Sequence, residues 1–178
     1  MTATLHLWRR LDWRFLMPEP LAGTLLVAGR PDKLLLEALP LLDAVTVVRE
    51  PPPADTVCTA YLVDPRPADL AAAVAVLRPG GVLYAEVSRR SRRTSPAAWG
   101  RAARGLGLLD VQVHWHAPDF AARTRVVPLD DRAAVLDTLS RHDGVRAGAL
   151  RAGLAGAVYR MGALGDVIGH GSVLGRRA

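Results

Sequence analysis

A chain of 178 residues that is 50% hydrophobic is long enough to bury the core of one compact domain, which excludes disorder as a description of the whole chain. The net charge of +6 rests almost wholly on arginine, because Lys33 is the one lysine; a composition rich in arginine and alanine is also what a GC-rich genome produces, so we expect no nucleic-acid partner. Cys58 is the single cysteine, which excludes an internal disulfide and a thiolate zinc cage, and we expect no metal.

The first twenty residues carry four charged side chains where the apolar core of a secretory signal would lie. Apolar runs elsewhere fall short of the roughly 20 residues that a membrane span needs. We therefore expect a cytoplasmic protein without a membrane segment.

The N-terminal segment, 5–16, places large apolar residues among arginines and ends at Pro18 and Pro20. It predicts a short helix across a sheet edge or a cap over a pocket. We interpret Trp8 and Trp13 as core anchors, with a platform for a ligand as the alternative.

Strands and helices are then predicted in alternation. Apolar runs predict strands at 24–28, 44–48 and from about 55 to 63. Pro31 is a first-turn residue for a helix that Pro40 breaks, and a second helix covers 68–77. We expect this helix to end at Pro79, with Gly80 and Gly81 taking positive φ in a tight reversal.

The stretch LRPGGVLYAEVS continues into a strand at 82–87 that is apolar on both faces, the pattern of a strand covered from both sides. A basic loop follows, and Ser95 with Pro96 opens a helix at 97–107. Strands are predicted at 111–116 and 124–127, adjacent and antiparallel. Asp130 or Asp131 caps a further helix, and a glycine-laced helical segment covers about 145–164.

With these elements placed, the chain from Thr24 to Val127 resembles a class I S-adenosylmethionine-dependent methyltransferase. LRPGGVLYAEV is similar to the segment that leads into the fifth strand of that family, and VQVHWH and TRVV to its last two strands. The resemblance implies an α/β fold: a three-layer, Rossmann-like sheet of about six strands, mostly parallel with an antiparallel strand near the end. We expect a single domain, with a cap segment at 1–22, a core at 23–128 and a C-terminal helical extension at 129–178.

The cofactor motif departs from the family pattern. Where the family has a glycine-rich loop after its first strand, this chain reads LLVAGRPDK, so only Ala28 and Gly29 remain as cofactor-binding candidates. Arg30 and Pro31 add bulk, and Pro31 removes an amide donor. Glu50 follows the second strand, where the resemblance implies a ribose-binding carboxylate; a solvent-facing turn is the alternative. The chain between 49 and 55 is too short for the family's usual helix and third strand, so we expect that edge strand to be missing.

Three residues are catalytic candidates. Asp64 and Pro65 resemble the start of a motif of amino-group methyltransferases that lacks its aromatic residue here, and capping of the next helix is the alternative. His114 and His116 share a strand face, followed by Asp119; they offer general-base or metal chemistry, or a packed pair.

Arg89, Arg90, Arg92 and Arg93 form a cluster just after the 82–87 strand, at the edge where open α/β sheets bind ligands. They are candidates for an acidic or phosphorylated ligand, and a solvated loop is the alternative.

The sequence thus supports three functions. The first is a divergent methyltransferase-like protein of small-molecule biosynthesis, from secondary metabolites to sugars, in which S-adenosylmethionine binding is impaired or lost. The second is an active small-molecule methyltransferase using Glu50, Asp64 and one of the two histidines. The third is a non-catalytic subunit that pairs, as a homodimer or with a partner enzyme, through Trp8, Trp13 or the glycine-laced helix.

Overall fold

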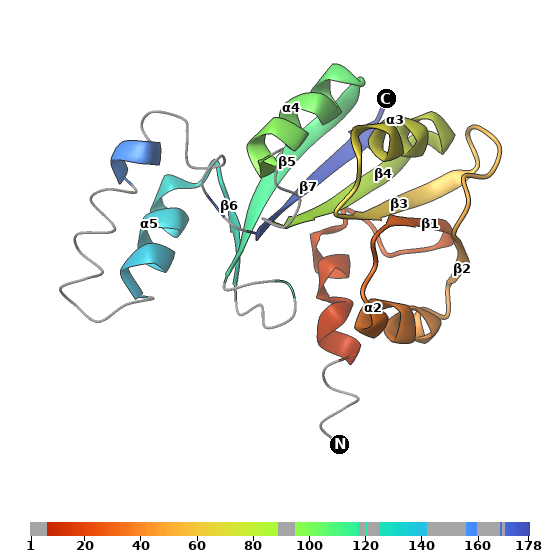
Figure 1. Ribbon diagram of the computed structural model, residues 1–178, viewed down its shortest axis with the longest axis horizontal. Helices are drawn as coiled ribbons and strands as arrows, with labels where there is room; N and C mark the ends of the chain where they lie inside the picture. The colour runs from red at the N-terminus through yellow and green to blue at the C-terminus, as the bar shows by residue number, and fades with distance from the viewer. Residues whose placement is uncertain are drawn as a thin grey trace.

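Seven strands form one mixed sheet in the order β2-β1-β3-β4-β7-β5-β6 (Figure 1). The computed structural model describes residues 7–88, 95–117, 120, 125–141, 156–159, 168 and 170–178. The strands are β1 (Gly23–Gly29), β2 (Val45–Val48), β3 (Val57–Val63), β4 (Leu77–Ser88), β5 (Leu108–Ala117), β6 (Arg125–Pro128) and β7 (His170–Arg177). Strands β1 to β4 pair in parallel, which confirms the predicted α/β fold class.

The strand β7 was not predicted. It lies between β4 and β5 and is antiparallel to both, so the sheet has a seventh strand drawn from residues assigned to the helical extension. Its sequence, HGSVLGRR, has too few consecutive apolar residues to predict a strand. Gly171 is required by packing, because a Cβ there would lie 2.6 Å from the Pro96 side chain and 2.8 Å from the carbonyl oxygen of His114. The predicted antiparallel pairing of β5 with β6 is confirmed.

The connections between the strands contain the helices α2 (Lys33–Ala38), α3 (Pro67–Val76), α4 (Pro96–Gly105) and α5 (Arg132–Arg141). The helix α2 begins after Pro31, because the Asp32 side chain accepts the Leu35 amide as its N-cap, and a 3-10 turn, η2 (Leu39–Leu41), follows it. Ser95 and Asp131 accept the amides of Ala98 and Ala134, as the predicted caps of α4 and α5. Of the predicted 145–164 helix, the structure describes 156–159, and these residues are helical.

The stretch LRPGG belongs to the sheet. The helix α3 ends at Val76, and β4 begins at Leu77, opposite Val57; pairing then shifts to Val82 opposite Thr59. Gly80 has the expected positive φ of 74°, but the same expectation is wrong for Gly81. Glycine is needed at position 81 because a Cβ there would lie 2.8 Å from the carbonyl oxygen of Arg78. The helix therefore ends before Pro79, and the predicted tight turn lies inside the irregular first part of β4 instead of preceding the strand.

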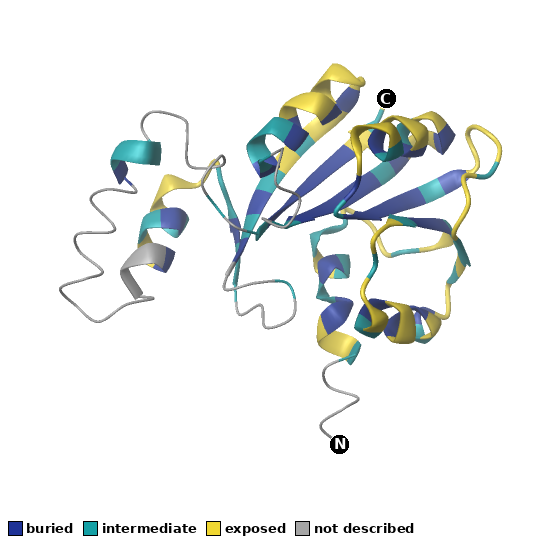
Figure 2. Ribbon diagram, viewed as in Figure 1, coloured by how far each residue is buried: buried dark blue, intermediate teal, exposed yellow. Residues whose placement is uncertain are grey.

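A hydrophobic cluster lies on each face of the sheet, whose central strands are coloured mostly as buried in Figure 2. A third, smaller cluster joins β6 to α5 through Val127 and Val135. The helices α3 and α4 cover one face, where Leu70 and Trp99 pack against Leu62 and Val87. The N-terminal segment and α2 cover the other face. Within the described helices, none is long and apolar enough to cross a membrane.

The N-terminal segment is helical at 7–10 and continues as the 3-10 helix η1 (Asp12–Leu16). Trp13 is fully buried, with its ring centroid 4.5 Å from that of Tyr61 and 5.5 Å from that of Tyr84. The prediction of a core anchor is therefore confirmed for Trp13. It is wrong for Trp8, which is 40% exposed.

In the part of the chain that the structure describes, no strand lies beyond β2. The short connection from 49 to 56 leads from β2 directly to β3, as its length predicted. The sheet thus ends at β2 on this side.

Candidate functional site

The carboxyl ends of the parallel strands meet at one edge of the sheet, where ligands of open α/β sheets bind. The strands β1, β3 and β4 end there at Gly29, Val63 and Ser88, and the pairing places Gly29 opposite Val63 and Val63 opposite Glu86. Asp64 follows Val63 directly. This edge therefore gathers the cofactor-binding candidate Gly29 and the catalytic candidate Asp64.

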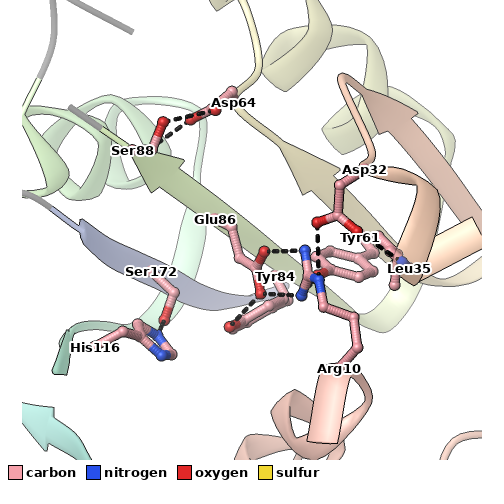
Figure 3. Close-up of polar contacts among 10 residues, drawn as sticks. All are labelled: Arg10, Asp32, Leu35, Tyr61, Asp64, Tyr84, Glu86, Ser88, His116 and Ser172. Atoms are coloured by element: carbon pink, nitrogen blue, oxygen red, sulfur yellow. Dashed lines mark hydrogen bonds and ion pairs between the residues drawn. The ribbon is translucent and has the colours of Figure 1, made fainter. Parts of the chain in front are cut away.

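A buried ion pair lies just inside this edge (Figure 3). Arg10 of the N-terminal segment donates to both carboxylate oxygens of Glu86 in β4, over 2.9 Å from Nη1 to Oε1 and 2.6 Å from Nη2 to Oε2. Arg10 is 2% exposed and Glu86 is fully buried. Such a bidentate geometry gives both ions hydrogen bonds, and these compensate the large cost of removing the ions from water.

Tyrosines of two strands complete this network. Arg10 Nη1 also donates to the Tyr61 hydroxyl at 2.8 Å, and the Tyr84 hydroxyl lies 3.4 Å from Glu86 Oε1. Burial raises the pKa of Tyr61 well above its usual range, and the nearby Glu86 raises it further, so the phenol stays protonated. Burial lowers the pKa of Arg10, but the electrostatic interactions with Tyr61, Glu86 and Asp32 together outweigh it and leave that pKa above its usual value.

Asp32 ties the same arginine to the loop after β1. Its Oδ2 accepts Arg10 Nε at 3.0 Å, while its Oδ1 accepts the Leu35 amide at 2.7 Å. The Asp32 carboxylate thus caps the N-terminus of α2 and also forms an ion pair with Arg10 of the N-terminal segment. Arg10 in turn bridges the loop after β1 to the end of β4 (Figure 3).

The loop after β1 is closed against β3. Gly29 has a φ of 85°, and a Cβ there would lie 2.2 Å from the carbonyl oxygen of Val63. The Arg30 amide donates to that same oxygen at 2.6 Å. Since Pro31 has no amide hydrogen, the backbone donors at the start of this loop are already used or missing.

Asp64 links the ends of β3 and β4. Its two carboxylate oxygens accept the amide of Ser88 at 2.6 Å and the hydroxyl of Ser88 at 2.7 Å, and its own amide donates to the carbonyl oxygen of Glu86 at 2.8 Å. The alternative role as a helix cap is wrong, because Arg66 is the N-cap residue of α3. Asp64 has a φ of 42°, a strained value of the kind that collects at functional sites.

The two histidines of β5 belong to a buried polar row. Ser172 of β7 lies opposite both Glu86 and His114, and its hydroxyl is 2.7 Å from His116 Nε2 (Figure 3). Because side chains alternate along a strand, these groups share the face that the N-terminal segment covers. Both histidines are buried, at 4% and 0% exposure, so the packed alternative holds for their environment.

His114 has a buried ring nitrogen that is left unsatisfied. Its buried Nδ1 has no hydrogen-bond partner among the described residues. Burial lowers the pKa of His114 below its usual value of 6.5, against an opposing effect of Asp130. The imidazole is therefore neutral near pH 7 and able to accept a proton.

Two further predicted site residues, Ala28 and Glu50, do not join this edge network. Ala28 packs in the core beside α3, and Glu50 is exposed two residues after β2. Arg89, Arg90, Arg92, Arg93 and Asp119 lie outside the described residues. No cluster of His, Cys, Asp or Glu suited to a metal occurs within the described ranges.

Sequence reasoning missed Arg10, Glu86 and Tyr61 as a unit. One signal was present: Glu86 stands inside the apolar run VLYAEVS, and a carboxylate in a strand covered on both faces needs a cationic partner. The identity of that partner was not predictable, because Arg10 is 76 residues away.

No model of a known protein family matches this sequence, and no curated protein matches it. Solved structures do match. A S-adenosylmethionine-dependent methyltransferase of Thermotoga maritima, described as a possible histamine N-methyltransferase, aligns over 98% of this chain and 89% of its own, with a TM-score of 0.52 and 13% identity.

Two further matches have lower TM-scores. Phosphoethanolamine N-methyltransferase 2 of Haemonchus contortus, solved with S-adenosylmethionine, aligns over 96% of this chain and 52% of its own, with a TM-score of 0.49 and 10% identity. Geranyl diphosphate C-methyltransferase of Streptomyces coelicolor aligns over 98% and 79%, with a TM-score of 0.44 and 13% identity. The sheet order and the Thermotoga match together show that this chain has the α/β fold of the S-adenosylmethionine-dependent methyltransferases.

Proposed function

We propose that this protein is a divergent methyltransferase-like protein of small-molecule biosynthesis in which S-adenosylmethionine binding is lost. In this proposal, the side chains at the carboxyl ends of β1, β3 and β4, here called the cofactor edge, block the place where the cofactor would bind. The observation that carries the proposal is the burial of Arg10 between Asp32 and Glu86. This contact spans the strand ends over which a methyltransferase of this fold holds its cofactor.

The residues at this edge do not fit the cofactor. A glycine-rich loop admits a ligand by exposing backbone amides and leaving room for close approach. Here the carbonyl oxygen of Val63 occupies the space that a side chain at Gly29 would need, and the Arg30 amide already donates to that oxygen. The Asp32 carboxylate already has two partners. A ligand that needs the Arg30 amide or the Asp32 carboxylate must therefore break the contacts that join β1, β3 and the N-terminal segment.

Thermal unfolding with and without ligand tests the proposal. A ligand that binds only the native state at 100 times its dissociation constant stabilises a protein by about 2.7 kcal/mol. We expect no change in Tm with S-adenosylmethionine or S-adenosylhomocysteine at about 1 mM, beside an active methyltransferase whose Tm rises under the same conditions. A rise of several degrees for this chain would overturn the proposal.

An active methyltransferase is the second candidate, and His114 favours it, since a buried imidazole that is neutral near pH 7 is suited to take a proton from a substrate. Glu50, Asp64 and His116 are the other residues to substitute. Transfer of a labelled methyl group to any small-molecule acceptor, lost in His114→Gln, would favour this candidate over the first.

A further inference from the structure

A groove of about 730 Å³ lies at the opposite end of the sheet, between the N-terminal segment and the start of β2. Its walls include Trp8, Phe15, Leu21 and Leu41. Trp8 is 40% exposed and Phe15 is 79% exposed. Exposed aromatic side chains that flank an apolar groove mark a surface that binds another molecule.

Arg14 lies between these two aromatic rings. Its guanidinium carbon is 5.4 Å from the centroid of the Trp8 ring and 5.6 Å from that of the Phe15 ring. Its Nε donates to the carbonyl oxygen of Leu11. Among the described residues Arg14 forms no ion pair, so both of its Nη groups remain available to an anion.

Two acidic side chains, Glu19 and Asp43, line the same groove and are exposed. Within the part of the chain that the structure describes, neither forms an ion pair with Arg14 or with another cation. The groove thus carries an available cation and two available anions beside exposed apolar side chains.

A surface with both signs of charge supplies the opposite charges that a twofold interface pairs. In such an interface, if residue i of one copy contacts residue j of the other, j also contacts i. The net charge of the chain also favours contact between two copies through this groove. At a net charge of +6, two copies repel one another, and the repulsion is least where acidic side chains outnumber basic ones.

We propose that this groove, lined by Trp8, Arg14, Phe15, Glu19 and Asp43, is the interface of a homodimer. The aromatic side chains of one copy enter the groove of the other. Arg14 of each copy then pairs with Glu19 or Asp43 of the second copy.

Sedimentation equilibrium of the full chain tests the proposal. We expect a mass of about twice 19.1 kDa, and a dissociation constant that rises about tenfold or more in Trp8→Ser and Phe15→Ser. Leu106→Ser is the matched control, because Leu106 is 41% exposed and does not line the groove. A wild-type monomer at concentrations up to about 100 μM, or a dimer that Phe15→Ser leaves intact, overturns the proposal. A monomer whose groove binds a small apolar probe would do so as well.

Variants that reverse the charges of the groove provide a second test, which remains valid if the serine variants fail to fold. Arg14→Glu gives a groove with acidic groups alone, and the double variant E19R/D43R gives one with basic groups alone. Each variant is expected to be monomeric by itself, and an equal mixture is expected to form a heterodimer. A mixture that remains monomeric contradicts the assigned pairs.

Discussion

Arg10 and Glu86 are 76 residues apart in the chain and meet in the protein interior, where Nη1 of the guanidinium donates to Oε1 of the carboxylate and Nη2 donates to Oε2. With 2% and 0% exposure, neither ion has water to replace a lost partner. This pair fixes the N-terminal segment over the strand ends. Because both ions are buried, the loss of either one is expected to lower the free energy of unfolding.

Removal of one partner is expected to destabilise the fold strongly. Glu86→Leu leaves a buried cation without its main anion, and we expect a loss of about 3–5 kcal/mol in the free energy of unfolding. The double variant R10M/E86L removes both charges and is expected to recover most of that loss. Urea unfolding measures both, and Lys33→Ala, at an exposed pair, is the control, expected within about 0.5 kcal/mol of wild type. Equal losses in the single and double variants would contradict the interpretation.

Gly29 is expected to tolerate no side chain. Gly29→Ala must adopt a φ of 85° and places a Cβ 2.2 Å from the carbonyl oxygen of Val63. The positive φ costs about 1–2 kcal/mol, and the contact adds to it by parting β1 from β3. Gly80→Ala, with a φ of 74° and nothing within 4 Å, isolates the cost of φ, and Gly105→Ala has neither constraint. Measured by urea unfolding, the loss in the free energy of unfolding should be largest for Gly29→Ala, smaller for Gly80→Ala and smallest for Gly105→Ala. A loss in Gly29→Ala no larger than that in Gly80→Ala would show that β1 can move away from β3.

His114 is expected to make stability depend on pH. Its pKa is lowered in the folded protein, so the native state binds fewer protons than the unfolded state, whose histidine titrates near 6.5. The contribution of His114 is fully present above pH 6.5 and is lost as pH falls through the lowered folded-state pKa. Unfolding free energies between about pH 7.5 and pH 5 should fall more steeply for the wild type than for His114→Gln. Parallel curves would exclude this role.

The strands β1 to β4 were predictable because each is a short apolar run bounded by proline, glycine or charged residues. β7 was not, because two glycines and two arginines interrupt its apolar pattern; it forms a strand because β4 and β5 offer it partners on both sides. Long-range pairing, rather than local preference, decides that element.

The candidate site likewise contains residues that could be predicted from the sequence and residues that could not. Gly29 and Asp64 were found through the resemblance to the methyltransferase family, which places each of them at the end of a predicted strand. The roles of Asp32 and Arg10 depend on where the N-terminal segment docks, and no local pattern encodes that position. Asp64 shows the difference at a single residue, since its place was predicted while its partner, Ser88, was not.

Calorimetric titration of the wild-type protein with S-adenosylmethionine decides whether the cofactor edge is closed. With Arg10 buried between Asp32 and Glu86, we predict no heat beyond dilution at cofactor concentrations up to about 1 mM. Saturable binding with a micromolar dissociation constant would contradict this, and would identify the protein as a methyltransferase that binds its cofactor without the glycine-rich loop.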